Sequence, residues 1–429
     1  MKYEELVLYR NLKHGDILEG MSRLYEGEEG DAAFAARMVG EILELSGKYG
    51  FSGNLWHAFL TYCLVNNENV FSRAMEMRDV SGGSLYEAAL KDMSKFRKFF
   101  HWKLENLGKR LGTEVFSLLL NYIPPVEEGE TFNKRVRDRI IGLAAELNRA
   151  ESDEEFLLSV KAFYREYGVG VLGLHKAFRI RAEGGALPRI EPIRRVQHTA
   201  LSDIVGMEPQ KELLMQNTEA FLKGRKANNV LLFGDAGTGK SSCIKGIINK
   251  YYADGLRIIE LYKHQLKYLS DVIAMVKHRN YRFIIYMDDL SFEDQEVEYK
   301  YLKAVIEGGL EKKPDNVLIY ATSNRRHLIH EGFKDRLDRG ADDDVHESDT
   351  MQEKLSLASR FGITIYFGRP DKKEYDHIVR VLSERYGITM PEEELLLLAN
   401  RFELSHGGRS GRTAEQFIHY LLGVVLPGK

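Results

Sequence analysis

A glycine-rich segment in the middle third of the chain, Gly234-Asp235-Ala236-Gly237-Thr238-Gly239-Lys240-Ser241, limits the possible folds more than any other stretch. It has the spacing of a Walker A motif, follows the apolar run 230–233 and opens a helical run from Cys243 to Ile248. Glycines let the backbone curl so that successive N–H groups, aided by the helix dipole, point at phosphate oxygens. The segment, with Ser242 beside it, therefore predicts a phosphate-binding loop.

Two carboxylates follow a second apolar run, 283–287. Asp288 lies 48 residues after Lys240 (288 − 240), and Asp289 comes next. Lys240 would bridge the β- and γ-phosphates, while Asp288 and the Ser241 hydroxyl would hold Mg²⁺, which needs only one or two carboxylates besides its water ligands. Asp289 would then orient or deprotonate the attacking water. Glu293 is a second candidate for that role.

The composition sets broader limits. A chain of 429 residues predicts two or three domains, because one hydrophobic core seldom serves such a length. The formal net charge of −3 gives no overall field for nucleic acid or an anionic membrane, so any such contact must be local. The two cysteines, Cys63 and Cys243, exclude a disulfide framework and a paired-cysteine zinc site. With no apolar stretch of ~20 residues and no signal-peptide pattern, we expect a cytoplasmic protein without a membrane span.

The hydrophobic pattern divides the chain into four parts. Residues 1–185 have helical periodicity and predict an all-helical domain that could bind a partner, and 186–200 concentrate turn-forming residues and predict a linker. Residues 201–368 alternate short β-rich runs with helical ones, and 369–429 predict a helical lid. Five buried strands would form a parallel α/β sheet covered on both faces. These strands are expected at 230–233, 257–261, 283–287, 317–321 and 363–367.

The order of these motifs resembles that of AAA+ P-loop ATPases over residues 201–429. In that class the strand expected at 317–321 lies between the two Walker strands, and the resemblance implies that Asn324 at its end polarises the attacking water as a first sensor. Most AAA+ proteins have Glu where this chain has Asp289. The assignment of the base therefore stays open between Asp289 and Glu293.

Further segments extend the resemblance. Residues 356–362 resemble the arginine-finger segment of Holliday-junction branch-migration motors, which implies that Arg360 reaches the γ-phosphate of a neighbouring subunit. Residues 407–414 look like a second-sensor segment, in which Arg412 would contact the nucleotide and Arg409 is the alternative. The resemblance thus implies ATP and Mg²⁺ as cofactors and hydrolysis between subunits of a homo-oligomeric ring, such as a hexamer.

Upstream of the Walker A motif, residues 201–206 are similar to the short AAA+ segment that packs on adenine, and Ile204 and Val205 would supply the apolar contact. Four segments also resemble the bacterial family catalogued as domain of unknown function eight hundred and fifteen. They span residues 228–232, 288–293, 319–328 and 353–357. That family is itself uncharacterised, so the resemblance does not name a partner.

Three tasks compete for such an ATPase. Threading unfoldases carry an aromatic-apolar-Gly loop after the second strand, whereas residues 262–268 contain no Gly, so threading is disfavoured. A nucleic-acid loader or remodeller would need a local basic surface, and an ATP-gated scaffold with little turnover would grip a protein through the helical domain. A GTPase is disfavoured because no Asn-Lys-x-Asp occurs. Basic residues, which could equally form a solvated face, crowd one predicted helical region: Lys91, Lys95, Arg97, Lys98, Lys103, Lys109 and Arg110.

Overall fold

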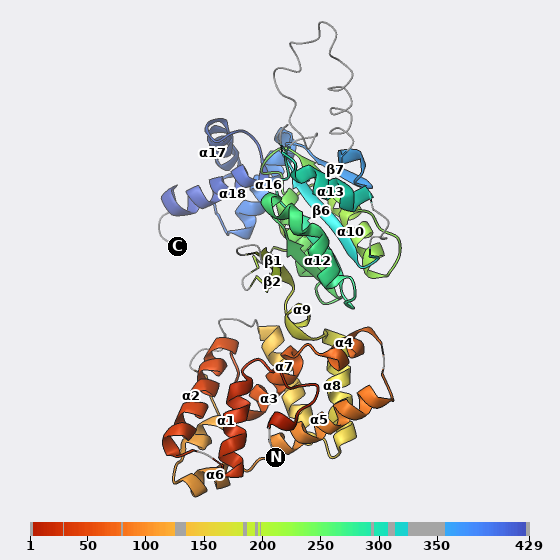
Figure 1. Ribbon diagram of the computed structural model, residues 1–429. Helices are drawn as coiled ribbons and strands as arrows, with labels where there is room; N and C mark the ends of the chain where they lie inside the picture. Colours follow the sequence, from red (N-terminus) through yellow and green to blue (C-terminus); the bar gives the residue numbers. More distant parts are fainter. Residues whose placement is uncertain are drawn as a thin grey trace. The chain divides into compact units, whose positions relative to one another are not determined.

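A computed structural model describes the chain except for residues 1–2, 29, 79, 125–133, 183–186, 194–195, 198, 293–295, 308–313, 325–356 and 426–429. The chain forms two compact units (Figure 1). The first contains Met1–Lys176, Pro192–Arg194 and His278–Asn280, and the second contains Ala177–Glu191, Arg195–Lys277 and Tyr281–Lys429.

The first unit is built from helices around one apolar core. The central helix α3 (Leu55–Asn66) is buried on nearly all sides and packs on α2, α5, α7 and α8, as expected for a helix that is apolar all round. The other helices contribute apolar residues to that core, although η1 does so only through the partly buried Tyr3. They are η1 (Tyr3–Glu5), α1 (Gly15–Glu26), α2 (Ala32–Tyr49), α4 (Val70–Met77), α5 (Ser84–Phe100), α6 (Leu104–Leu111), η2 (Val115–Leu119), α7 (Lys134–Arg149), α8 (Asp153–Tyr167) and α9 (Gly170–Leu174).

Short polar side chains and glycines set the helix ends in this unit. Asp31 and Asn54 accept hydrogen bonds from the backbone N–H groups of the first turns of α2 and α3. Gly27, Gly50 and Gly112 end α1, α2 and α6 in the left-handed conformation that glycine adopts without strain. The local sequence therefore specifies the helical segments as well as their buried faces.

The second unit is built on a seven-stranded sheet in the order β2-β1-β4-β5-β6-β3-β7. The pairs β1/β4, β4/β5, β5/β6, β6/β3 and β3/β7 are all parallel. The five expected strands are confirmed, and β6 lies between the two Walker strands. The strands are β1 (Ala177–Arg181), β2 (Arg189–Pro192), β3 (Val230–Gly234), β4 (Leu256–Glu260), β5 (Arg282–Met287), β6 (Val317–Ser323) and β7 (Ile363–Phe367).

Two strands correct the sequence prediction. The expected helical domain to residue 185 and the expected linker 186–200 are wrong where β1 and β2 extend the sheet beyond β4. The first unit accordingly ends at Lys176. β1 is short and alternates buried with exposed side chains, with Phe178 and Ile180 inside and arginines outside, so it lacks the continuous apolar run of the central strands.

Helices cover the sheet and form a cluster after β7 (Figure 1). In the described residues these are η3 (Leu201–Asp203), α10 (Glu208–Leu222), α11 (Lys240–Tyr251), η4 (Lys263–Tyr268), α12 (Leu269–Val276), α13 (Glu298–Glu307), α16 (Lys372–Arg385), α17 (Glu392–Ser405), α18 (Gly411–Tyr420) and η5 (Leu421–Val425). Helices α16 to α18 share a small apolar core of their own and make up the segment that the sequence predicts as the lid. Within the described segments, every helix is too short or too polar to cross a bilayer.

Candidate nucleotide-binding site

The loop between β3 and α11 has a backbone that only glycine fits. Gly234, Gly237 and Gly239 have φ values of 131°, 77° and 97°, in the region that side chains disfavour. A Cβ atom on Gly234 would lie 2.2 Å from the carbonyl oxygen of Phe367 on the neighbouring strand β7. The glycine pattern that predicted a phosphate-binding loop is therefore a requirement of the local conformation.

Lys240, the first residue of α11, points its ammonium group back into this loop. Its Nζ donates hydrogen bonds to the carbonyl oxygens of Gly234 (2.9 Å) and Asp235 (2.6 Å) and to Oδ1 of Asn324 (3.0 Å). Burial lowers the pKa of Lys240, although the nearby carboxylates of Asp235, Asp289 and Asp288 oppose that effect. The cation is thus held at the loop by oxygen atoms, an arrangement suited to meeting an anionic ligand.

Asp288 directly follows β5 and contacts Ser241 of the Walker A motif. Its Oδ1 accepts hydrogen bonds from the hydroxyls of Ser241 (2.7 Å) and Thr322 (2.6 Å). Burial opposes ionisation of Asp288, but the hydrogen bonds from the Thr322 and Ser241 hydroxyls help to outweigh it, and the carboxyl pKa is lowered. An ionised carboxylate and a hydroxyl side by side are oxygen donors of the kind that Mg²⁺ prefers.

Asp289 and Asn324 are also brought together. Nδ2 of Asn324 donates to Oδ1 of Asp289 at 2.6 Å, while Oδ1 of the same amide accepts from Lys240. Asp289 has φ 50°, a left-handed conformation that costs a non-glycine residue on the order of 1 kcal/mol. Its backbone N–H donates to Oγ1 of Thr322 (2.9 Å), which helps to hold that conformation. The alternative base, Glu293, lies outside the described residues.

A cavity of about 750 Å³ opens beside the loop and is lined by residues of the core and of the lid. Most of the predicted site residues line it, including Ala236, Gly237, Thr238, Gly239, Lys240, Ser241, Ser242, Asp288, Asp289, Asn324, Arg412, Ile204 and Val205. Gly234 and Asp235 belong to the loop without lining the cavity. The sequence reasoning missed several further lining residues, which carry no recognisable motif: Met207, Thr322, Ile378, Leu382, Arg385, Tyr386 and Glu415.

The lid approaches the phosphate-binding loop through Arg412. Its backbone N–H donates to the carbonyl oxygen of Gly237 at 3.2 Å, and its side chain lines the cavity. Arg409 instead directs Nε to Glu403 at 3.2 Å and does not line the cavity. Arg385 on α16 donates to the carbonyl oxygens of residues 202 and 203, at 2.6 and 2.7 Å, and so joins the lid to the segment that contains Ile204. The geometry thus favours Arg412 over Arg409 as the lid residue that would contact a nucleotide.

Arg360 is not brought to the loop of its own chain. It precedes β7, whose first residue Ile363 pairs with Val230 at the start of β3. Because β3 and β7 are parallel, Arg360 lies near the amino-terminal edge of the sheet, whereas the phosphate-binding loop follows the carboxyl-terminal edge. The Arg360 side chain is 38% exposed, and its guanidinium forms a 2.6 Å ion pair with Glu307 at the end of α13.

Curated proteins match only a small part of the chain. The large subunit of replication factor C from Methanococcus vannielii is 31% identical over 84 residues, which are 20% of this chain and 17% of that protein. The same subunit from Staphylothermus marinus is 30% identical over 90 residues, 21% of either chain. The chain therefore spans about a fifth of the length of these relatives.

Among solved structures, a proline-to-glycine mutant of Thermotoga maritima RuvB is similar with a TM-score of 0.38 and 16% identity over 54% of this chain and 68% of that chain. The AAA domain of FIGL-1 in complex with ADP has a TM-score of 0.37 and 16% identity, over 54% and 76% of the two chains. A family model matches residues 174–425, more than half of the chain, and the protein therefore belongs to the family described as "Protein of unknown function (DUF815)".

Proposed function

We propose that this protein binds Mg-ATP in the cavity beside the phosphate-binding loop and hydrolyses it between the subunits of a homo-oligomeric ring, to remodel or switch a macromolecular partner. One observation carries the proposal. Lys240, Asn324 and Asp289 form a continuous chain of hydrogen bonds at the carboxyl-terminal edge of the sheet. That edge is where ligands bind in open parallel α/β sheets.

The metal would be held by oxygen atoms that already lie together. Oγ of Ser241 lies 2.7 Å from Oδ1 of Asp288, and these two side chains would hold Mg²⁺. In the described residues no three His, Cys, Asp or Glu side chains form a closed metal site, which fits an ion that arrives with the nucleotide. The ion would neutralise phosphate charge as the reaction proceeds.

The remaining side chains have separate tasks in phosphoryl transfer. Lys240 would exchange its contacts with loop carbonyls for contacts with the phosphates, which would leave Asn324 free to orient the attacking water. Asp289 would accept a proton from that water, since its Oδ1 is already positioned by the Asn324 amide. Ile204 and Val205 would contact the adenine ring of the nucleotide, because both are half-buried where the cavity meets the lid.

Arg360 supports the intersubunit part of the proposal. An exposed arginine at the opposite edge of the sheet from its own phosphate-binding loop can reach a nucleotide only in another copy of the chain. Its ion pair with Glu307 would hold the guanidinium ready in the separate subunit. The charge that develops on the γ-phosphate would then be stabilised across the interface.

Two variants test binding and hydrolysis separately. Lys240→Ala should lose Mg-ATP affinity in a calorimetric titration, because the β- and γ-phosphates lose their cation. Lys250→Ala, near the other end of the same helix, is the matched control and should bind as the wild type does. Asp289→Asn should bind Mg-ATP and release no phosphate. If Lys240→Ala binds like the wild type, the site is misassigned, and if only Glu293→Gln stops phosphate release, the base is Glu293.

A further inference from the structure

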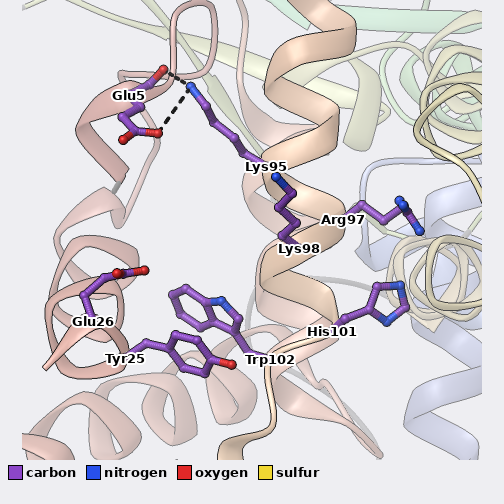
Figure 2. Close-up of a pocket in the computed structure, with 8 residues that line it drawn as sticks. All are labelled: Glu5, Tyr25, Glu26, Lys95, Arg97, Lys98, His101 and Trp102. Carbon is purple, nitrogen blue, oxygen red and sulfur yellow. Dashed lines mark hydrogen bonds and ion pairs between the residues drawn. The ribbon is translucent and has the colours of Figure 1, made fainter. Parts of the chain in front are cut away.

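A stack of three aromatic rings lies beside a groove in the first unit, and two of the rings, Tyr25 and Trp102, line the groove. Tyr25 at the end of α1 stacks on Trp102 with ring centres 4.2 Å apart and planes 5° apart, and Trp102 stacks on Trp56 at 5.6 Å and 9°. The Trp56 indole is fixed by a 2.8 Å hydrogen bond to the carbonyl oxygen of Phe99. Trp56 and Trp102 are buried, whereas Tyr25, the outer ring, is half-buried. The stack thus presents a rigid aromatic ring to the groove, whose volume is about 570 Å³ (Figure 2).

Lysines approach this ring along one face of α5. Lys91, Lys95 and Lys98 are spaced at i, i+4 and i+7, so they share a face of the helix. Asp92 does not pair with them, because it is fully buried and its carboxylate accepts the backbone N–H groups of residues 7–9. The basic run in the sequence is therefore a cationic stripe that leads to the aromatic ring.

The cations at the groove differ in how far they are already engaged. Arg97 is bound to Asp153 at 2.7 Å, and Lys95 reaches the backbone carbonyl of Glu5, with the Glu5 carboxylate at 4.0 Å (Figure 2). Lys98 is exposed and, in the part of the chain that the structure describes, forms neither a hydrogen bond nor an ion pair. Lys98 is thus the cation best placed for an external anion.

His101, which also lines the groove, lies near the same positive charges. Burial lowers the pKa of His101, and the positive charges of Arg97 and Lys103 lower it further. His101 would therefore meet a ligand as a neutral hydrogen-bonding group. Glu26 also lines the groove, and its negative charge would repel an anionic ligand. Stacking on the aromatic ring must therefore supply part of any affinity.

We propose that this groove binds single-stranded nucleic acid, with a base stacked on Tyr25 and the backbone phosphates along Lys98 and Lys91. Stacking rings beside a cationic track are the combination that single strands recognise, and every base offers a face to such a ring. The bases of a duplex are stacked on one another and cannot stack on Tyr25, and an acidic side chain has no flat ring to stack there. The proposal deepens the proposed function by naming its partner, although the binding itself needs no ATP turnover.

The test uses the full chain and a fluorescently labelled single-stranded oligonucleotide of mixed sequence, in low salt and without ATP. Fluorescence anisotropy should show binding that weakens steeply as salt is added, because counterions are released from the strand. The Lys240→Ala chain should bind equally well, which separates this proposal from the ATPase assignment. Absence of binding by the wild-type chain would overturn the proposal.

Two variants locate the site, and two more serve as controls. Tyr25→Leu keeps an apolar contact with Trp102 but removes the stacking ring, and should weaken binding at least about fivefold. Lys98→Glu should weaken it about tenfold and reduce the salt slope by about one. Tyr25→Phe keeps the ring, and Lys134→Glu changes an exposed lysine on α7 outside the groove, so both should bind as the wild type does. Equal binding by all four variants would refute the site.

Competitors identify the ligand chemistry. An excess of unlabelled single strand should displace the probe, while polyglutamate, duplex of the same sequence and mononucleotide should compete much less well. If polyglutamate competes as well as the strand, the groove binds anions without reading bases and the proposal is wrong. If the mononucleotide or the duplex competes equally, a single strand is not the ligand. Thermal unfolding of each variant verifies that the first unit is intact.

Discussion

Thr322 is a positioning residue whose loss can be predicted in detail. Its buried hydroxyl donates to Oδ1 of Asp288 at 2.6 Å and accepts the backbone N–H of Asp289 at 2.9 Å. Thr322→Val keeps the shape of the side chain and removes both bonds. We therefore expect Asp288 to lose part of the stabilisation of its charge, and Asp289 to lose an anchor of its left-handed backbone.

The magnitude follows from the hydrogen bond to a charged group. Such bonds contribute about 1.5–3 kcal/mol, and because Asp288 is partly open to water we expect a loss of about 1–2 kcal/mol in the free energy of unfolding at neutral pH. Thr322→Ser retains the hydroxyl and should keep most of that stability. Denaturant unfolding of the two variants and the wild type measures the difference.

The stability lost in Thr322→Val should depend on pH. The pKa of Asp288 is lowered in the folded protein, so its contribution to stability is present above the unfolded pKa and is lost as the pH falls through the folded value. The stability gap between Thr322→Val and the wild type should therefore be complete at neutral pH and shrink below about pH 4. A gap that is absent at neutral pH, or that grows on acidification, would refute this account of Thr322.

Two further predictions concern the arginines. Arg412→Ala should lower Mg-ATP affinity roughly tenfold, the value of one charge-assisted hydrogen bond, whereas Arg409→Ala should not, and isothermal titration compares them. Arg360→Ala should bind ATP normally and lose roughly 10³-fold or more in phosphate release. Mixing Arg360→Ala with Lys240→Ala should recover activity, since some interfaces then combine an intact loop with an intact finger; wild-type turnover by Arg360→Ala alone would contradict the shared site.

The central strands and the phosphate-binding loop could be predicted because their chemistry is local. All residues of β6 are buried, and its first five, 317–321, form a continuous apolar run that indicates a strand covered on both faces. The loop glycines are required by backbone conformation at their own positions. Neither inference needed knowledge of a distant neighbour.

The features that the sequence did not reveal depend on partners far along the chain. β1 becomes a strand by pairing with β4, about eighty positions later, and its alternating arginines hide it from a search for apolar runs. Thr322 has its role only because β6 lies beside β5, where the end of one strand meets Asp288. Arg385 likewise gains its role from the loop carbonyls of residues 202 and 203.

The N-cap of α18 determines which of Arg409 and Arg412 lies at the phosphate-binding loop. Ser410 is the N-cap of α18, and its hydroxyl accepts the backbone N–H of Thr413 at 3.0 Å. Arg412 consequently lies in the first turn of the helix, where its free N–H meets Gly237. Arg409 precedes the cap and turns to Glu403. Both arginines fit the motif in sequence, but only the start of the helix, set by Ser410, directs Arg412 to the cavity where we propose that the nucleotide binds.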